Sequence, residues 1–189
     1  MYYHASQTKD IKVLEPRVSN HNIPLIYFSD KRENVLVYLS NAIEKFCKET
    51  NFEYDGIYSK WGPYSFTKDG RLQLEEYYPN ATIETYKGVE AYIYHIEEVP
   101  GIEVLEGISN AFKTSIPTKI DFVEYIPDAY DAIMEEVDKG NIVLVKYEEF
   151  IKTKKDWLEN IIKKEYDEAD THPEYSYFLK SKFSFLKDY

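Results

Sequence analysis

The alternation of apolar and polar residues divides the chain into short strands and amphipathic helices. Residues 24–29 begin with a proline and continue with four apolar or aromatic side chains, a pattern typical of a short buried strand. Apolar residues then recur at helical spacing, which predicts an amphipathic helix over residues 31–49. Asp30 followed by Glu33 fits a capping box at the start of this helix. Residues 1–6 predict a second strand that pairs beside the first.

Beyond residue 50 the same patterns predict several strands and then helices. Strands are expected over residues 57–61, 89–96 and 119–126, with 102–108 as a further candidate. Two segments stay open: residues 71–78 fit a strand or a helical turn, and residues 142–145 fit a strand or the start of a helix. Helices are expected from Pro127 to about Lys139, around residues 157–162, and from Pro173 onward. Residues 8–22 and 109–118 read mainly as loops.

This order of elements predicts a single α+β domain over residues 1–189. The sequence contains no repeat period, low-complexity segment or obvious linker. We therefore expect an α+β core over residues 1–150, with C-terminal helices over 151–189 packed on it. The residues expected to make this contact are Trp157, Leu158, Ile161, Phe178 and Leu179.

Composition narrows the classes of partner. The formal net charge of −11 opposes a long phosphate backbone, so general binding of nucleic acid is not expected. A small anionic ligand needs only a local cluster of donors and stays open. No signal peptide or apolar stretch of membrane-spanning length is visible, which favours a cytoplasmic protein with no membrane contact. The one cysteine, Cys47, fits a buried core thiol.

Motif searches exclude several chemistries. The sequence has no glycine-rich phosphate loop, no nucleophile elbow and no paired-cysteine metal site. None of the four histidines has a second histidine or cysteine at metal-ligand spacing, so we expect no metal.

A small set of polar and aromatic residues near the N-terminus remains as the candidate site. His4 and Ser6 lie on the first predicted strand, Tyr27 near the end of the second, and Tyr38 on the helix that follows. A histidine on a strand offers one donor and one acceptor, and two tyrosines can stack on a flat heterocycle. These residues either frame a nucleotide pocket or are ordinary core aromatics. Arg17, on the intervening loop, either contacts the ligand or is solvated.

Two stretches resemble motifs of the poly(ADP-ribose)-polymerase-like ADP-ribosyltransferases. Residues 3–6, Tyr-His-Ala-Ser, are similar to the His-Gly-Ser or His-Gly-Thr motif of that family. Residues 26–30, Ile-Tyr-Phe-Ser-Asp, followed by Tyr38, are similar to its second motif. The chain departs from the family at Ala5 and Val35, where the family has glycine and serine. The resemblance implies an ADP-ribosyltransferase-like split antiparallel sheet with flanking helices.

The resemblance also implies roles for individual residues. His4 would bond the adenosine ribose, and Tyr27 and Tyr38 would sandwich the nicotinamide. The third family motif, a glutamate or glutamine on a later strand, has no clear counterpart. Glu106 is the best placed by order along the chain, with Glu103 and Glu124 as alternatives, and each also fits an acidic surface residue.

Two functions are therefore expected from the sequence. The first is an ADP-ribosyltransferase-like enzyme that binds NAD and transfers ADP-ribose to an unknown acceptor, such as a protein. There Glu106 would stabilise the positive charge that develops on the ribose. The alternative is a catalytically inactive nucleotide-binding or protein-interaction domain on the same scaffold.

Overall fold

Short antiparallel strands and helices make up the chain, which confirms the predicted α+β class. The computed structural model describes residues 1–18 and 23–189, so part of the predicted 8–22 loop lies outside the described residues. The chain forms two compact units. Unit 1 comprises residues 1–39, 66–72 and 88–143, and unit 2 comprises residues 40–65, 73–87 and 144–189. Each is described by itself below, and the expected single domain stays a prediction.

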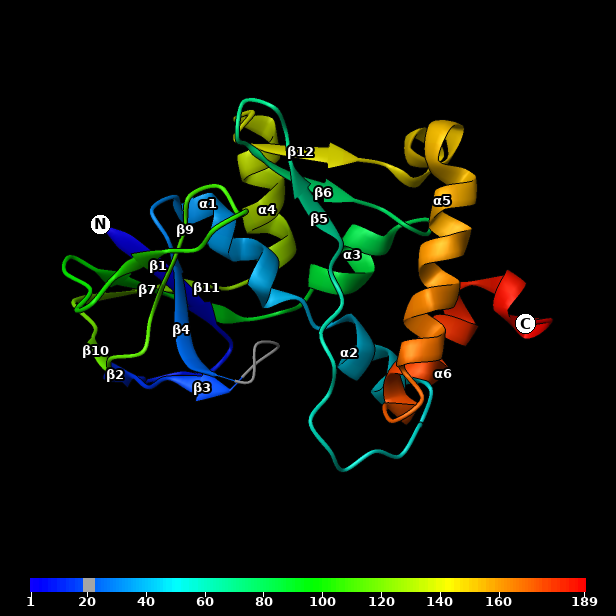
Figure 1. Cartoon of the computed structure of the whole chain (residues 1–189), viewed down its shortest axis with the longest axis horizontal. Helices are drawn as coiled ribbons and strands as arrows, with labels where there is room; N and C mark the ends of the chain where they lie inside the picture. The colour runs from blue at the N-terminus through cyan, green and yellow to red at the C-terminus, as the bar shows by residue number, and fades with distance from the viewer. Residues whose placement is uncertain (19–22) are drawn as a thin grey trace. The chain divides into compact units, whose positions relative to one another are not determined.

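Figure 1 labels the elements along the chain. The strands are β1 (Tyr2–Ser6), β2 (Val13–Leu14), β3 (Arg17–Val18), β4 (Pro24–Ser29), β5 (Tyr64–Phe66), β6 (Leu72–Glu75), β7 (Ala91–Ile96), β8 (Glu103–Val104), β9 (Ala111–Thr114), β10 (Thr118–Lys119), β11 (Phe122–Ile126) and β12 (Ile142–Val145). The helices are α1 (Arg32–Val35), α2 (Ala42–Glu49), α3 (Ala81–Tyr86), α4 (Ala129–Asp138), α5 (Tyr147–Glu168) and α6 (Pro173–Lys182), with 3-10 turns η1 (Leu36–Leu39) and η2 (Ser184–Lys187).

The main sheet of unit 1 has the order β11-β7-β1-β4-β9-β8, and β3 pairs with β4 outside this path. Among the described residues, the strand pairings in this sheet are antiparallel. β1 stays in register with β7 over its whole length, from Tyr2 opposite Ile96 to Ser6 opposite Tyr92. In contrast, β1 and β4 are in register only at Tyr3 and Ser29 among the described residues. The sheet therefore opens between β1 and β4.

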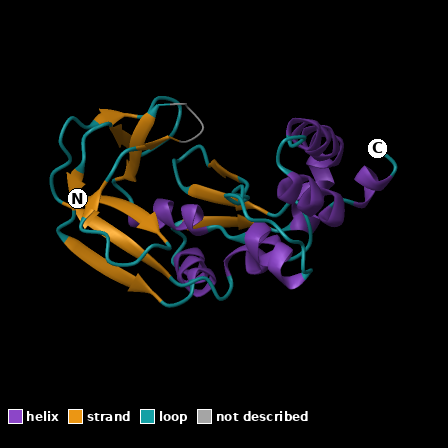
Figure 2. Ribbon diagram, turned by 90° about the horizontal axis from the view of Figure 1, so that it is seen from below, coloured by secondary structure: helices purple, strands orange, loops and turns teal. Residues whose placement is uncertain are grey.

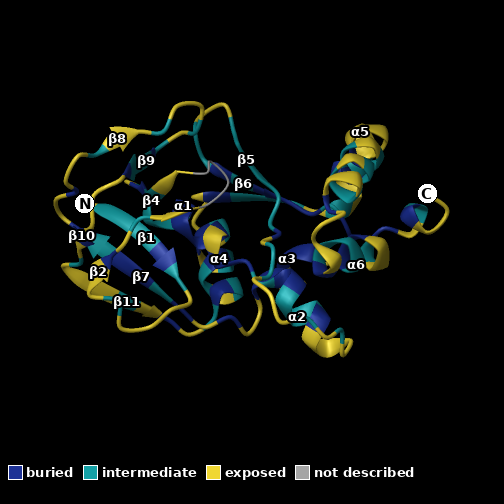
Figure 3. Cartoon of the chain, turned by 60° about the horizontal axis from the view of Figure 1, so that its bottom comes forward, coloured by how far each residue is buried: buried dark blue, intermediate teal, exposed yellow. Residues whose placement is uncertain are grey.

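The two faces of this sheet are covered differently. One face carries an apolar cluster of buried side chains from β2, β4, β7 and the segment after β7: Leu14, Ile26, Phe28, Tyr94, Ile96 and Val99. On the unit's helical side, α1 and η1 pack against β1, and α4 packs against η1. Figure 3 shows the contrast between the buried central strands and the largely exposed edge strands β8 and β11. Strand β1 is thus held in the middle of the unit as a rigid support.

The predicted helix over residues 31–49 is wrong in its continuity. Helical structure is divided into α1, η1 and α2, with a break at Ser40 and Asn41. Serine and asparagine favour helix caps over helix interiors, and Asn41 is the N-cap of α2 with φ −142°. The expected Asp30 cap is also wrong: α1 begins after Lys31, whose backbone N–H donates to Ser29 Oγ at 3.1 Å.

Other element predictions were partly right. Helices α4 and α6 begin near their prolines as expected, and Asp128 Oδ1 accepts from the backbone N–H of Tyr130 at 2.9 Å to cap α4. Both open segments contain strands, β6 and β12. The predicted strand over 57–61 is a loop. The backbone N–H of Ser59 donates to Glu174 Oε1 at 3.2 Å and not to a neighbouring strand. The predicted 109–118 loop contains β9, which pairs with β4.

Helices dominate unit 2, as the purple segments of Figure 2 show. Helices α2, α3, α5 and α6 meet around an apolar core that includes Phe150, Leu158, Ile162, Phe178 and Leu179, all 4% exposed or less. Trp157, expected to pack like Leu158, is 48% exposed and lies edge-on to the Tyr77 ring. The amphipathic pattern of α5 and α6 thus predicted the burial of Leu158, Phe178 and Leu179 but not the exposure of Trp157.

Replacing Leu158 by alanine should lower the free energy of unfolding of unit 2 by about 2–5 kcal/mol, because the change leaves a cavity in a closed core. Lys155→Ala, on the exposed side of α5, is the matched control and should change it by less than about 0.5 kcal/mol. Urea unfolding of both variants and the parent measures the difference. Equal midpoints for Leu158→Ala and the parent would contradict the packing described.

Candidate functional site

A pocket of about 220 Å³ lies in unit 1 beside the opening between β1 and β4. His4 and Ser6 reach it from β1, Tyr27 from β4 and Arg17 from β3. Figure 1 shows these strands in blue. The remaining lining residues are Ile11, Val13, Leu14, Glu15, Leu25 and Ile26. The fold therefore brings together four of the five residues predicted to bind a nucleotide.

His4 is fixed in one chemical form. Its Nδ1 lies 2.9 Å from the backbone oxygen of Tyr27. A carbonyl oxygen only accepts, so Nδ1 must carry a proton and donate. Burial lowers the pKa of His4, and the positive charge of Arg17 adds to this, against the opposing effect of the Tyr27 hydrogen bond. At neutral pH the ring is thus uncharged, and Nε2 is an acceptor with no hydrogen-bond partner within residues 1–18 and 23–189.

Ser6 and Arg17 add donors to the same pocket. Ser6 Oγ accepts from the backbone N–H of Thr8 at 3.1 Å, which leaves its own hydroxyl hydrogen for a ligand. The guanidinium of Arg17 is exposed and carries donors suited to phosphate. Because the charge of Arg17 acts on His4, the two groups lie within electrostatic reach of one another. The pocket thus combines an imidazole nitrogen that accepts, a serine hydroxyl that can donate, and an exposed cation.

The two tyrosines differ in their relation to the pocket. Tyr27 lines it and provides the carbonyl that orients His4. Tyr38 is not among the lining residues; it lies in η1 and is 45% exposed. Of the two tyrosines predicted to stack on the ligand, Tyr27 therefore lines this pocket and Tyr38 does not.

None of the three candidate glutamates lines the pocket. Glu106 is exposed in the turn after β8. Glu103, also exposed, lies 3.5 Å from the ammonium of Lys113. Glu124 is held by Arg32, whose Nε lies 3.0 Å from one carboxylate oxygen and whose Nη2 lies 2.5 Å from the other.

The Glu124 ion pair is part of a structural network in unit 1. His95 Nε2 lies 3.1 Å from Glu124, and Arg32 Nη1 lies 3.4 Å from Glu136 on α4. Burial acts to raise the pKa of Glu124, but Arg32 and His95 outweigh it and the pKa lies below its usual range. The network ties α1, β7, β11 and α4 together, so Glu124 serves the fold.

The carboxylate that the structure places at the pocket is Glu15. It lies between β2 and β3, two residues before Arg17, where no periodic pattern predicts a site residue. One signal was available: Pro16 holds the preceding residue in an extended conformation, so Glu15 and Arg17 point to the same side of the chain.

Comparisons with known proteins add no further evidence on the site: no family model, curated protein or solved structure matches the chain. The described residues contain no group of three or more histidine, cysteine, aspartate or glutamate side chains arranged to hold a metal. Within the same residues, each helix is too short or too polar to cross a membrane.

The pKa shift of His4 predicts how stability depends on pH. Since the folded-state pKa lies below the ordinary value of 6.5, the unfolded chain takes up a proton that the folded chain does not. The free energy of unfolding should therefore decrease as the pH falls from about 6.5 toward the lowered pKa, and level off below it.

Guanidinium unfolding at several pH values tests this effect in the parent and in His4→Gln, which cannot titrate. Subtracting the two curves removes the contribution of the carboxylates. A parent and a His4→Gln variant with parallel curves would show that His4 is not buried in its neutral form.

Proposed function

We propose that unit 1 binds a nucleotide of the NAD and ADP-ribose class through the pocket at His4, and that it transfers ADP-ribose from NAD. The observation that carries this proposal is the fixed tautomer of His4, which presents Nε2 as an acceptor for a ribose hydroxyl. Arg17 lines the same pocket and would bind a phosphate there. This assignment agrees with the ribose contact that the resemblance implies for His4.

The size of the pocket limits which part of the ligand it holds. A volume of about 220 Å³ is below the roughly 300–1,000 Å³ typical of sites that enclose a whole small-molecule ligand. We therefore assign the pocket to one ribose and its adjoining phosphate, with the remainder of the dinucleotide outside it. The apolar side chains of Ile11 and Leu25 line the pocket and would pack against the sugar.

The transfer step needs a carboxylate near the reacting ribose. The glycosidic carbon–nitrogen bond breaks, its electron pair leaves with nicotinamide, and an acceptor oxygen or nitrogen forms the new bond to the anomeric carbon and loses its proton. Positive charge develops on the ribose during this step, and a negative charge beside it lowers the barrier. Glu15 is an exposed carboxylate at the lining of the pocket, from which it would reach the nicotinamide ribose outside, and we assign it this role in place of Glu106.

Binding without turnover is the second candidate function. It is favoured by the positions of Glu103, Glu106 and Glu124, none of which lines the pocket. If Glu15 does not act on the ribose, the pocket still offers the groups that hold a nucleotide. The two functions therefore share the binding site and differ in the role of Glu15.

Arg17→Ala should weaken ADP-ribose binding roughly tenfold to a hundredfold, because a charge-assisted hydrogen bond to phosphate is worth about 1.5–3 kcal/mol. Adenosine, which has no phosphate, should bind the variant and the parent alike. Arg71→Ala is the control, since Arg71 is paired with Asp69 at 2.9 Å and does not line the pocket. Calorimetric titration gives the affinities; equal losses for both ligands would argue against a phosphate at Arg17.

Glu15→Gln should abolish most NAD hydrolysis or transfer while keeping NAD affinity within a few-fold, because the amide keeps the shape but not the charge. Glu106→Gln should leave both unchanged. Release of nicotinamide followed by chromatography measures the rate. Tight binding with no nicotinamide release from the parent would instead favour the second candidate function, and turnover lost in Glu106→Gln alone would reverse the assignment of Glu15.

A further inference from the structure

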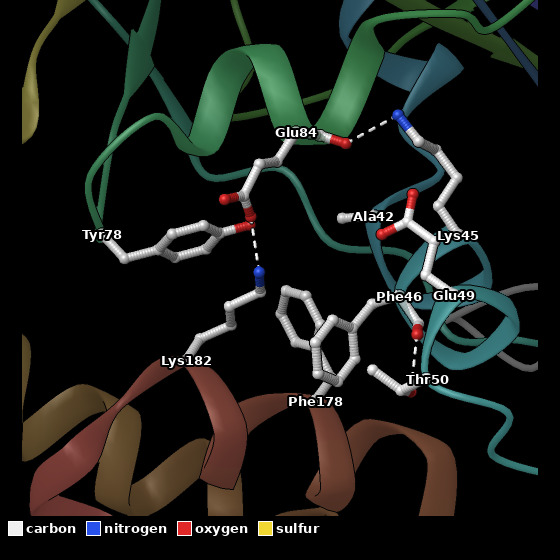
Figure 4. A pocket seen from close by; sticks show the side chains of 9 residues that line it. All are labelled: Ala42, Lys45, Phe46, Glu49, Thr50, Tyr78, Glu84, Phe178 and Lys182. Carbon is white, nitrogen blue, oxygen red and sulfur yellow. Dashed lines mark hydrogen bonds and ion pairs between the residues drawn. The ribbon is translucent and has the colours of Figure 1, made fainter.

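Unit 2 contains a second cavity of about 240 Å³, in which the chain's own lysine occupies a cation site. Figure 4 shows Lys182 reaching from α6 toward the carboxylate of Glu84 on α3. The Lys182 ammonium lies 2.5 Å from Glu84 Oε2. It also lies 4.8 Å from the ring centroid of Phe46 and 5.1 Å from that of Tyr78. Both distances are within the range of a cation–π interaction.

The groups around this ammonium are those that select organic cations. Phe178 supplies a third ring, 6.0 Å from the Lys182 ammonium. Tyr78 is 4% exposed, and its ring lies over the Lys182 ammonium beside Glu84. Three aromatic rings and a carboxylate form a site for an ammonium group.

The cavity beside this ammonium continues toward α2. Its walls include Ala42, Thr50 and the carboxylate-bearing side chain of Glu49. In Figure 4 the Glu49 carboxylate faces the same space as the Glu84–Lys182 pair, with the Phe46 and Phe178 rings below them. The cavity is therefore a partly apolar space with two carboxylates in its lining, those of Glu49 and Glu84.

The lysine at the other side of the cavity does not reverse this charge pattern. Lys45 Nζ donates to the backbone oxygens of Glu84 and Lys87, at 2.9 and 2.6 Å, where it satisfies carbonyls at the end of α3. These two hydrogen bonds hold the Lys45 ammonium against the backbone of residues 84 and 87. The formal net charge of −11 also attracts cations to the molecule as a whole.

We propose that this cavity binds a small aliphatic diamine, one ammonium of which displaces Lys182 from Glu84 and the three rings. The carbon chain of the ligand fills the cavity over Phe46 and Phe178, and its second ammonium pairs with Glu49. Lys182 is the internal competitor: it closes the site when no amine is bound. This assignment is independent of the nucleotide pocket, because all of its residues belong to unit 2.

The test is a calorimetric titration of the full chain with 1,5-diaminopentane, pentylamine and 1,5-pentanediol. The diamine should bind tightest, the monoamine less tightly and the uncharged diol not at all. Lys182→Ala removes the competitor and should raise diamine affinity about tenfold, although it also removes a contact of α6. Lys180→Ala, on the same helix, is the matched control and should leave the affinity unchanged.

Glu49→Gln tests the second ammonium at an exposed position where folding is not at risk. It should reduce diamine affinity to that of the monoamine and leave monoamine binding unchanged. If Lys182→Ala does not fold, Lys182→Gln provides the same comparison with a longer side chain. Equal diamine affinity in the parent and the folded Lys182 variant, or no binding of either amine at millimolar concentration, would overturn the proposal.

Discussion

The hydrogen bond between His4 Nδ1 and the Tyr27 carbonyl is the interaction on which the candidate site depends. It joins β1 to β4 where their backbone register is limited to a single residue pair. The His4 side chain thus connects β1 to β4 at a point where the backbone pairing of the two strands has ended. The same bond determines which ring nitrogen carries the proton, so one contact both holds the opening of the sheet and sets the chemistry presented to a ligand.

The rigidity of this arrangement comes from β7, not from β4. β1 is paired with β7 along its full length, and the apolar cluster around Tyr94 and Ile96 is closed. Behind the sheet, the Arg32–Glu124 pair connects α1 to β11, with His95 as a third member. A partly exposed ion pair of this kind contributes modestly to stability, and here it connects α1 to the sheet.

Local sequence signals predicted the elements that position His4 and Tyr27. The strand patterns at residues 1–6 and 24–29 are short but unambiguous, and both strands form. The site residues His4, Ser6 and Tyr27 follow from them because strands fix side-chain direction.

What the sequence did not predict depends on tertiary contacts. The break at Ser40 and Asn41 moved Tyr38 into a 3-10 turn, since a periodic apolar pattern does not reveal where a helix stops and restarts. Glu15 reaches the pocket through loop geometry, which has no periodic signature. On α5, Trp157 is exposed against expectation although the neighbouring Leu158 is buried; Figure 3 shows that this helix carries a large exposed surface.

The most direct measurement of the central claim is a ¹⁵N NMR spectrum of the histidine rings, recorded with and without ADP-ribose, with His4→Gln used to assign the signals. The account predicts that His4 is neutral at pH 7 with the proton on Nδ1, and that ADP-ribose shifts the Nε2 resonance in the direction of an accepted hydrogen bond. A charged His4 ring, a proton on Nε2, or a His4 signal unchanged at saturating ADP-ribose would contradict it.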